Sequence, residues 1–133
     1  MKNIILLFGL VVLMSSCSND DSGGDISTDL IGEWQLIEAN ADPGDGSGTF
    51  QPVDSDKVVV FLSNGTVTSN GSICILSIDS NNPTSGTYSL SDSTISSSDC
   101  VADRDVEFEI VNSNLIMRYP CIEACEEKFT KIK

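Results

Sequence analysis

The fold is decided by the stretch Lys57-Val58-Val59-Val60-Phe61-Leu62-Ser63-Asn64-Gly65-Thr66-Val67-Thr68. Its first half is apolar on both faces of an extended chain, which predicts a strand that is covered on both sides. Asn64-Gly65 suits a two-residue type I′ turn, because both positions tolerate a positive φ. Val67 and Thr68 then carry the return strand. The stretch therefore predicts a β-hairpin.

Alternation of apolar and polar residues predicts further strands on both sides of this hairpin. Upstream, Trp34 and Leu36 alternate with polar neighbours as a half-buried first strand. Downstream, the predicted strands are Gly86–Leu90, Thr94–Ser97, Val106–Ile110, Leu115–Tyr119 and Lys128–Ile132. Together with the hairpin, this gives eight short strands that are joined mostly by tight turns, with no helix pattern.

An all-β fold made of eight sequential strands favours an antiparallel up-and-down meander. Eight strands are enough to close into a small barrel, and closure removes the exposed sheet edges. A β-sandwich is the runner-up. Two segments are less regular. Asn40–Asp56 is rich in Gly, Asp and Pro and is interpreted as a long loop. Ile73–Ile78 is either an irregular cap over one barrel end or another strand.

The N-terminus has the pattern of a signal peptide. Lys2 gives a positive start, and Ile4–Met14 is an uncharged apolar run. At about 1.5 Å per residue, this run has about half the length of a bilayer-spanning helix. The small residues Ser15 and Ser16 follow, as a signal peptidase requires. We therefore expect residues 1–16 to be removed on export.

Met14-Ser15-Ser16-Cys17 resembles the lipobox of bacterial lipoproteins. The resemblance implies that the Cys17 thiol receives a diacylglyceryl group and that the new amine is acylated, for example with palmitate. Several acyl chains hold a protein stably on a membrane, whereas a single chain holds it weakly. Ser18–Asp21 resembles the acidic surface-export signal of Bacteroidota lipoproteins, or is an ordinary solvated linker. We therefore expect an exported protein that is lipid-anchored to the outer membrane, with surface display left open.

Removal of the signal peptide leaves 117 residues, with six Lys or Arg and twenty Asp or Glu. Residues 17–28 are predicted to form a lipid-anchored acidic linker and residues 29–133 a single domain. The side-chain balance of −14 argues against nucleic acid as a partner, because nucleic acid needs a basic face. It also argues against adsorption to anionic lipid headgroups.

The chain contains no histidine. Histidine is the commonest general base and the commonest metal ligand at neutral pH. A Ser-His-Asp or Cys-His catalytic arrangement is therefore excluded. We expect no enzymatic activity and predict no cofactor.

A calcium site is one interpretation of the Gly- and Asp-rich loop. Its candidate ligands are Asp45, Ser47, Thr49 and Asp56, whose spacing resembles part of an EF-hand loop. The sixth position holds Phe50, where an EF-hand has glycine. The alternative is a plain turn-rich loop, and we predict no metal.

The five cysteines divide into Cys17 for lipid and an even set of four: Cys74, Cys100, Cys121 and Cys125. In an oxidising compartment, the four are expected to form two disulfides. Three pairings are possible. The first choice is Cys121–Cys125 with Cys74–Cys100, because Tyr119–Cys125 is interpreted as a hairpin tip where two cysteines face each other. A four-thiolate zinc site is the alternative, although the spacing lacks paired C-x-x-C knuckles.

Ile31-Gly32-Glu33-Trp34-Gln35-Leu36 is similar to the opening G-x-W strand of lipocalin-like domains. Lys57–Thr68, Gly86-Thr87-Tyr88 and the Phe108–Tyr119 hairpin fall where such domains place later strands. Behind a lipobox, this ordered set resembles the small lipocalin-like lipoproteins of Bacteroidota, over roughly residues 30–133. The resemblance implies a small eight-stranded barrel. It leaves the function open, because barrels of this type host many roles.

The candidate residues for a ligand cavity are Trp34, Tyr88, Phe108, Met117 and Tyr119. The alternative is that they fill the interior, because a small barrel is just wide enough for its own side chains.

Two functions follow. One is a lipid-anchored barrel that holds a small apolar ligand in its mouth. The other is an envelope interaction or structural protein with a filled core, whose protein partner the sequence does not identify. The loop Asn40–Asp56 distinguishes them. A lid beside Trp34 favours ligand binding, and outward projection favours interaction.

Overall fold

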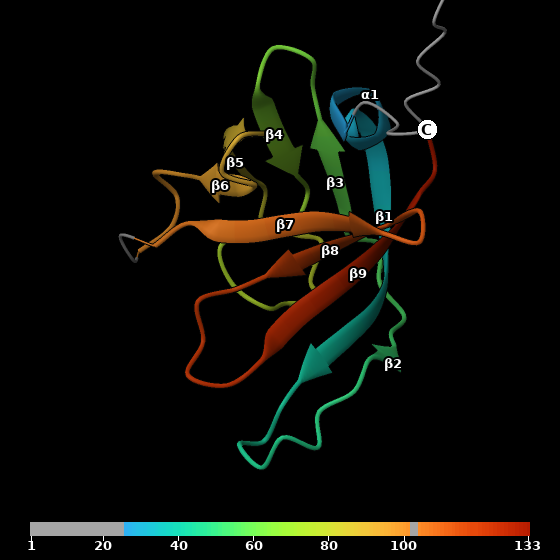
Figure 1. Cartoon of the computed structure of the whole chain (residues 1–133), viewed down its shortest axis with the longest axis vertical. Helices are drawn as coiled ribbons and strands as arrows, with labels where there is room; N and C mark the ends of the chain where they lie inside the picture. Colours follow the sequence, from blue (N-terminus) through green and yellow to red (C-terminus); the bar gives the residue numbers. More distant parts are fainter. Residues whose placement is uncertain (1–25, 102–103) are drawn as a thin grey trace, which may run out of the picture.

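The computed structural model describes residues 26–101 and 104–133. The predicted signal peptide, the lipid-attachment residue Cys17 and most of the predicted linker lie outside the described residues. Within them, one short helix and a single antiparallel sheet form the domain (Figure 1). No helix in this part of the chain is long and apolar enough to cross a membrane.

The helix and the strands follow the chain in a simple order. The helix α1 spans Ile26–Leu30. The strands are β1 (Gly32–Ala41), β2 (Gln51–Pro52), β3 (Val58–Phe61), β4 (Thr66–Ser69), β5 (Thr84–Ser89), β6 (Thr94–Ser96), β7 (Val106–Val111), β8 (Asn114–Arg118) and β9 (Cys125–Lys131). The eight predicted strands correspond to β1 and to β3 through β9, and β2 is additional.

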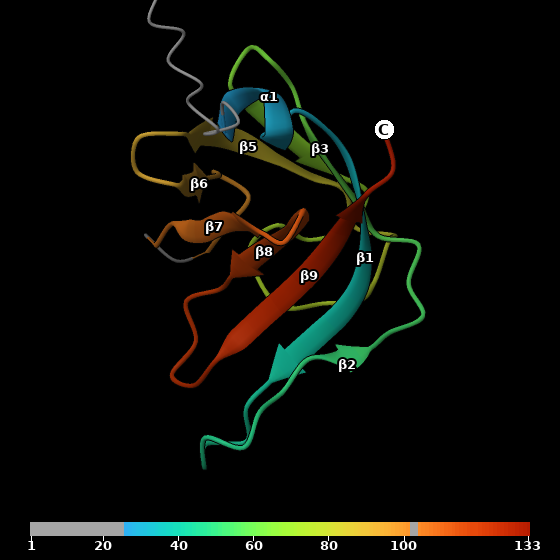
Figure 2. The same cartoon turned by 45° about the vertical axis from the view of Figure 1, so that its right-hand side comes forward.

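The sheet closes on itself. Its order is β2-β1-β3-β4-β5-β6-β7-β8-β9, and β1 also pairs with β9. This last pairing joins β1 and β3 through β9 into an eight-stranded antiparallel barrel, in which β1 and β9 run side by side (Figure 2). The register of β1 shifts between Leu36 and Glu38, where a bulge bends the strand. The predicted up-and-down barrel is therefore confirmed, in preference to the sandwich.

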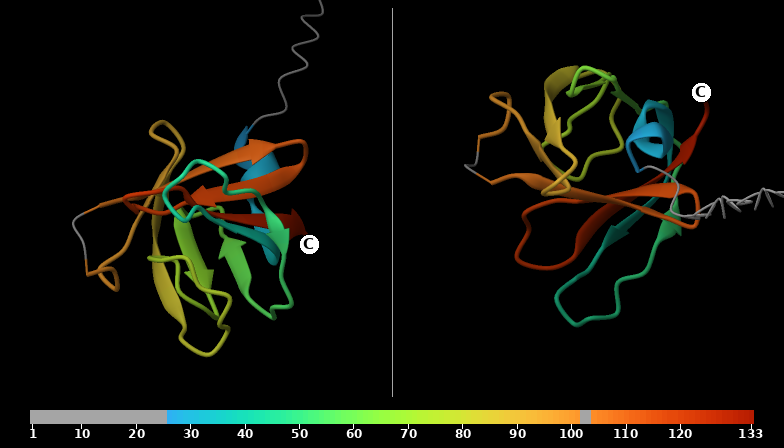
Figure 3. Two further views of the ribbon diagram at one scale, coloured as in Figure 1. Left: turned by 90° about the horizontal axis from the view of Figure 1, so that it is seen from below. Right: turned by 45° about the horizontal axis from the view of Figure 1, so that its top comes forward.

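The barrel has two unlike ends, which Figure 3 shows from below and with the top tilted forward. The helix end carries α1 and the short turns β3–β4, β5–β6 and β7–β8. The loop end carries the four longer connections β1–β3, β4–β5, β6–β7 and β8–β9. Because neighbouring strands run antiparallel, every second connection returns to the same end.

One cluster of buried apolar side chains fills the interior. It consists of Leu30, Trp34, Leu36, Val59, Phe61, Val67, Ile73, Ile95, Val106, Phe108, Leu115, Met117, Tyr119 and Phe129. Full burial of a large apolar side chain contributes about 1.5–3 kcal/mol. The ring of Tyr88 packs against this cluster and meets the ring of Phe61 edge-on, with 5.2 Å between centroids. The interior is therefore a packed core.

The helix α1 was not predicted from the sequence. It has a single turn, which is too short for a helical period to be recognised. Tertiary contacts hold it in place: Leu30 is fully buried, and its carbonyl accepts a 2.8 Å hydrogen bond from Trp34 Nε1. Lys131 Nζ donates to the carbonyl of Asp29. These contacts seat the helix over one end of the barrel.

The hairpin of β3 and β4 forms as predicted, with Phe61 opposite Val67, but its predicted turn type is wrong. Gly65 has a φ of 84°, whereas Asn64 is not among the residues with positive φ. The amide of Gly65 donates to the carbonyl of Leu62 at 3.2 Å. This arrangement matches a turn followed by a left-handed glycine. A type I′ pattern instead occurs at Asn112 and Ser113, whose φ values of 49° and 66° are both positive.

Gly65→Ala is expected to lower the free energy of unfolding by about 1–2 kcal/mol, because an L-residue resists the left-handed conformation. A Cβ placed at Gly65 meets nothing within 4 Å, so the effect is conformational and not steric. Urea unfolding monitored by Trp34 fluorescence measures it. Gly65→Asn is the control and is expected to cost less, since asparagine tolerates positive φ. Equal stability of wild type and Gly65→Ala would contradict the assignment.

The two irregular segments differ from one another. Asn40–Asp56 is only partly loop, because β1 continues to Ala41 and β2 forms at Gln51–Pro52. A two-residue exposed strand that contains proline leaves no alternation to recognise. Ile73–Ile78 has no regular structure, and Ile73 is fully buried in the core. Of the two interpretations offered, the irregular cap is therefore the one observed.

Candidate functional site

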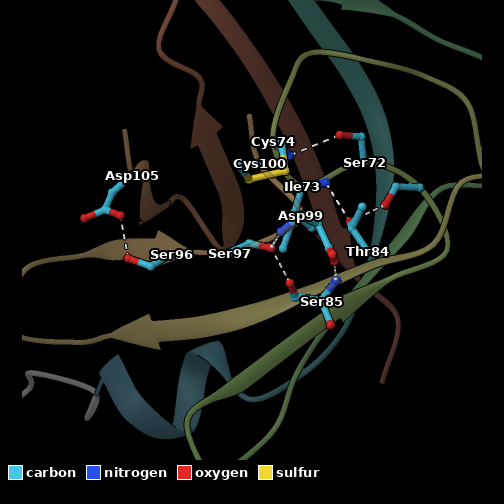
Figure 4. The surroundings of a disulfide bond; sticks show 11 residues. Ser72, Ile73, Cys74, Thr84, Ser85, Ser96, Ser97, Asp99, Cys100 and Asp105 are labelled. Atoms are coloured by element: carbon cyan, nitrogen blue, oxygen red, sulfur yellow. Dashed lines mark hydrogen bonds between the residues drawn. A yellow bond between two sulfur atoms is a disulfide. The ribbon is translucent and has the colours of Figure 1, made fainter. Parts of the chain in front are cut away.

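Two disulfides lie at the loop end. Cys74 pairs with Cys100, and Cys121 pairs with Cys125, which is the first-choice pairing from the sequence. Cys74–Cys100 joins the β4–β5 connection to the β6–β7 connection (Figure 4). Two disulfides are typical of an extracytoplasmic protein.

The surroundings of Cys74–Cys100 are tied to β5 by hydrogen bonds (Figure 4). The amide of Ile73 donates to Thr84 Oγ1 at 2.9 Å. The amide of Ser85 donates to Asp99 Oδ2, also at 2.9 Å. The disulfide therefore sits on a fixed base and positions the two connections on either side of it.

A groove of about 330 Å³ lies between the two disulfides. Its lining comes from three loop-end connections and includes Cys74, Ile75, Cys100, Val101, Tyr119 and Pro120. Ile75 is 61% exposed and Val101 is fully exposed. Exposed apolar side chains beside a concave surface favour the interpretation of this groove as a candidate binding site.

A buried polar network shares Tyr119 with this groove. The ammonium of Lys57 and the carboxylate of Glu127 form an ion pair of 2.7 Å, and both side chains are fully buried. The Tyr119 hydroxyl donates to Glu127 Oε2. Ser77 completes the network, because its amide donates to Glu127 Oε1 at 3.0 Å and its carbonyl accepts from Lys57 Nζ at 2.9 Å. Tyr119 is also among the residues that line the groove, so it belongs to both.

The network changes the acidity of its members. Burial raises the pKa of Tyr119 well above 10.0, and the neighbouring Glu127 carboxylate raises it further. Burial also lowers the pKa of Lys57, against the opposing effect of Glu127. Both directions follow from the high free energy of an isolated charge in an apolar interior.

The free energy of unfolding of the wild type, relative to Tyr119→Phe, is expected to fall by about 1.4 kcal/mol per pH unit above pH 10. The sign follows from the raised pKa: above pH 10 the unfolded phenol loses its proton while the native one keeps it. Urea unfolding between pH 9 and pH 11.5 measures the difference. A difference that is independent of pH would show that Tyr119 titrates normally in the native state.

The five candidate ligand-binding residues lie mainly in the core. Trp34, Phe108, Met117 and Tyr119 are at most 6% exposed and belong to the buried cluster. The Tyr88 hydroxyl donates to the carbonyl of Leu62 at 2.6 Å. These residues pack against one another and fill the barrel, with Tyr119 alone among them also lining the groove between the disulfides.

The four calcium candidates are spread along the chain on both sides of β2. Asp45, Ser47 and Thr49 follow one another along the exposed β1–β2 loop, and Asp56 precedes β3. Asp42 organises this loop, because its carboxylate accepts four backbone N–H groups, including Gly44 at 2.7 Å and Gly48 at 3.1 Å. No group of three acidic or sulfur side chains placed to hold a metal occurs in residues 26–101 and 104–133.

The β1–β2 loop does not cover Trp34. It lies at the loop end and projects away from α1 (Figures 1 and 3), whereas Trp34 is bonded to Leu30 at the helix end. The amide of Asp42 donates to Ala124 at 2.9 Å, so the loop lies beside the Cys121–Cys125 tip. Of the two arrangements considered from the sequence, a lid beside Trp34 and a loop that projects outward, the outward projection is the one observed.

Sequence reasoning missed Lys57, Glu127 and Ser77 as site residues. A signal for two of them was present, because side chains two apart on a strand share a face. Lys57 has the parity of Val59, and Glu127 has that of Phe129, and both of these are fully buried. Ser77 acts through its backbone, for which the sequence carries no signal.

The comparisons with known proteins agree with this architecture. A family model described as a lipocalin-like domain matches residues 30–132. Neither the curated proteins nor the solved structures contain a match. The matched region begins at the end of α1 and includes every strand of the barrel. The chain therefore belongs to the family of lipocalin-like domain proteins.

Proposed function

We propose that this protein binds a small, mainly apolar ligand in the loop-end groove, outside its filled barrel. The observation that carries the proposal is the groove itself, with exposed Ile75 and Val101 held open between two disulfides. Exposure of apolar surface to water is unfavourable, and a ligand that covers this surface lowers the free energy. The lipocalin-like fold is compatible with this role.

The size of the groove supports a small molecule in preference to a protein segment. About 330 Å³ lies at the lower end of the range for small-molecule sites. The disulfides favour affinity, because walls that are already fixed lose little conformational entropy on binding. The lining of the groove also includes the charged residues Asp99 and Arg104.

The proposal includes lipid attachment at Cys17 and an outer-membrane location. The motif around Cys17 supports it, as does the pair of disulfides. Ile26, where the described chain begins, belongs to α1 at the helix end. The chain from Cys17 therefore enters the barrel at the end opposite the groove. The proposed role includes no enzymatic step.

Native mass spectrometry of residues 18–133, purified gently from a bacterial periplasm, tests the proposal. A bound mass that is lost on denaturation is the expected result. Ile75→Asp/Val101→Asp is expected to lose this mass, because two carboxylates then face the ligand. Leu62→Asp/Leu90→Asp is the matched control, since both leucines are 42% exposed at the helix end. Retention of the ligand by the groove variant would place its binding elsewhere.

The projecting β1–β2 loop favours a second candidate function, which is contact with an envelope protein. Residues 43–49 extend beyond the barrel beside the Cys121–Cys125 tip. If this loop is the functional surface, its deletion abolishes the function of the protein in the cell, whereas Ile75→Asp/Val101→Asp leaves that function intact. The reverse pattern supports the ligand-binding role.

A further inference from the structure

The backbone of Ser77 occupies a polar site that the barrel strands build. Lys57 precedes β3, Tyr119 follows β8 and Glu127 lies in β9, so the barrel holds all three side chains in place. Ser77 belongs to the irregular β4–β5 connection. It offers one donor to Glu127 at 3.0 Å and one acceptor to Lys57 at 2.9 Å.

The segment around Ser77 has one apolar side chain on the core and several polar contacts. Leu76 is partly buried against the core, whereas Ile75 is 61% exposed and Ile78 is 48% exposed. The segment is also held by the disulfide at Cys74 and by a 2.6 Å hydrogen bond from Ser55 Oγ to the Ile78 carbonyl. A segment with few buried apolar contacts opens at a lower free energy than the whole domain.

When the Ser77 backbone moves away, two atoms of the buried network each lose a hydrogen-bond partner. Glu127 Oε1 then lacks one of its donors, and Lys57 Nζ lacks one of its acceptors, in a place where both side chains are fully buried. An unmatched buried polar group is strongly unfavourable. The open state therefore needs an occupant that supplies one donor and one acceptor.

The groove and this site share a segment of chain and one residue. Ile75 and Cys74, two and three residues before Ser77, line the groove, and so does Tyr119, whose hydroxyl bonds to Glu127. We propose that Lys57, Glu127 and Tyr119 bind the head group of an apolar ligand seated in the groove, and that Ser77 holds this place in the free protein. This inference rests on the proposed function of the groove.

The charges of the site define the class of head group. Lys57 and Glu127 already neutralise each other, so an additional carboxylate is repelled by Glu127 and an additional ammonium by Lys57. A neutral group with one N–H donor and one carbonyl acceptor reproduces what Ser77 offers. Lys57 Nζ and Glu127 Oε1 are only 3.0 Å apart, so the donor and the acceptor must lie on the same side of the head group. The ligand class is therefore an apolar chain or ring that ends in an unsubstituted carboxamide, because a trans N-substituted amide points its N–H away from its carbonyl.

Three probes of equal chain length test the inference on residues 18–133: octanamide, N,N-dimethyloctanamide and octanoate. Calorimetric titration is expected to show octanamide binding at least tenfold more tightly than the other two. Hydrogen exchange at saturation is expected to be faster at the Ser77 amide with octanamide, because that amide loses its acceptor. A ligand that protects Ser77 from exchange contradicts its displacement.

A double variant separates the head-group site from the groove. Lys57→Met/Glu127→Leu replaces the buried pair with apolar side chains of similar size and is expected to bind the three probes equally. Glu38→Leu/Lys128→Met removes a surface ion pair of the same composition and is expected to keep the preference for octanamide.

The outcomes distinguish the two proposals. Equal affinity of the wild type for octanamide and its dimethyl analogue overturns the head-group site and leaves the groove as the binding site. Tighter binding of octanoate overturns the neutral head group. Absence of binding by all three probes overturns the head-group site together with the groove.

Discussion

Glu127→Leu is expected to lower the free energy of unfolding by about 3–5 kcal/mol, because it leaves the buried ammonium of Lys57 without its counter-charge. Lys57 and Glu127 are both fully buried, and the ion pair of 2.7 Å is reinforced by Tyr119 and Ser77. The whole free energy of unfolding of a small domain is about 5–15 kcal/mol. The single substitution is therefore expected to leave a largely unfolded or marginal protein.

The double variant Lys57→Met/Glu127→Leu is the decisive control. Replacement of a whole buried ion pair by apolar residues is often neutral or stabilising, whereas removal of one partner is not. We expect urea unfolding to show most of the lost stability restored. A single variant that loses less than about 1 kcal/mol would mean that water reaches Lys57 in the native protein.

Removal of the Cys74–Cys100 disulfide is expected to lower the free energy of unfolding by about 3.5 kcal/mol. The two cysteines are 26 residues apart, so their bond restricts a long segment of the unfolded chain. Cys121 and Cys125 are only 4 residues apart, and loss of their bond is expected to cost about 2 kcal/mol. The loop-end groove depends on both bonds for its shape.

Paired serine variants measure these costs. Cys74→Ser/Cys100→Ser and Cys121→Ser/Cys125→Ser are each compared with wild type by urea unfolding under oxidising conditions. The reverse order, with the short loop costing more, would show that native contacts around the tip matter more than chain entropy. Unchanged stability in both variants would contradict a structural role for the bonds.

The architecture of the barrel follows from local patterns. Alternation places Val106 and Phe108 inward, and the pairing of β7 with β8 brings Phe108 opposite Met117. Each of these features depends on residues close in the chain, which a single sequence displays. Closure of β1 onto β9 joins residues almost a hundred positions apart, and it follows only because eight strands in one meander leave two edges to be paired.

Other features depend on tertiary contacts that no local pattern carries. The helix α1 exists because Leu30 fills the end of the core, and its sequence has too few residues to show a period. The turn at Gly65 differs from type I′ because Asn64 keeps a negative φ, although Asn-Gly tolerates either form. In both cases the sequence allows several local structures, and the rest of the barrel selects one.

The candidate site was predicted in part. The cysteine pairing and Tyr119 came from the sequence, and both border the groove. Lys57 and Glu127 were not predicted as site residues, because charged side chains are rarely buried. Their burial becomes reasonable only when β3 and β9 meet at the loop end, where each side chain supplies the partner that the other needs.

Methyl NMR of isoleucine-labelled residues 18–133 during titration with octanamide distinguishes binding in the loop-end groove from binding inside the barrel. We expect the Ile75 methyl signals to move, while those of the core residues Ile73 and Ile95 stay in place. Shifts that are confined to Ile95 and its core neighbours, with Ile75 unchanged, would place the ligand inside the barrel and overturn the proposed groove site.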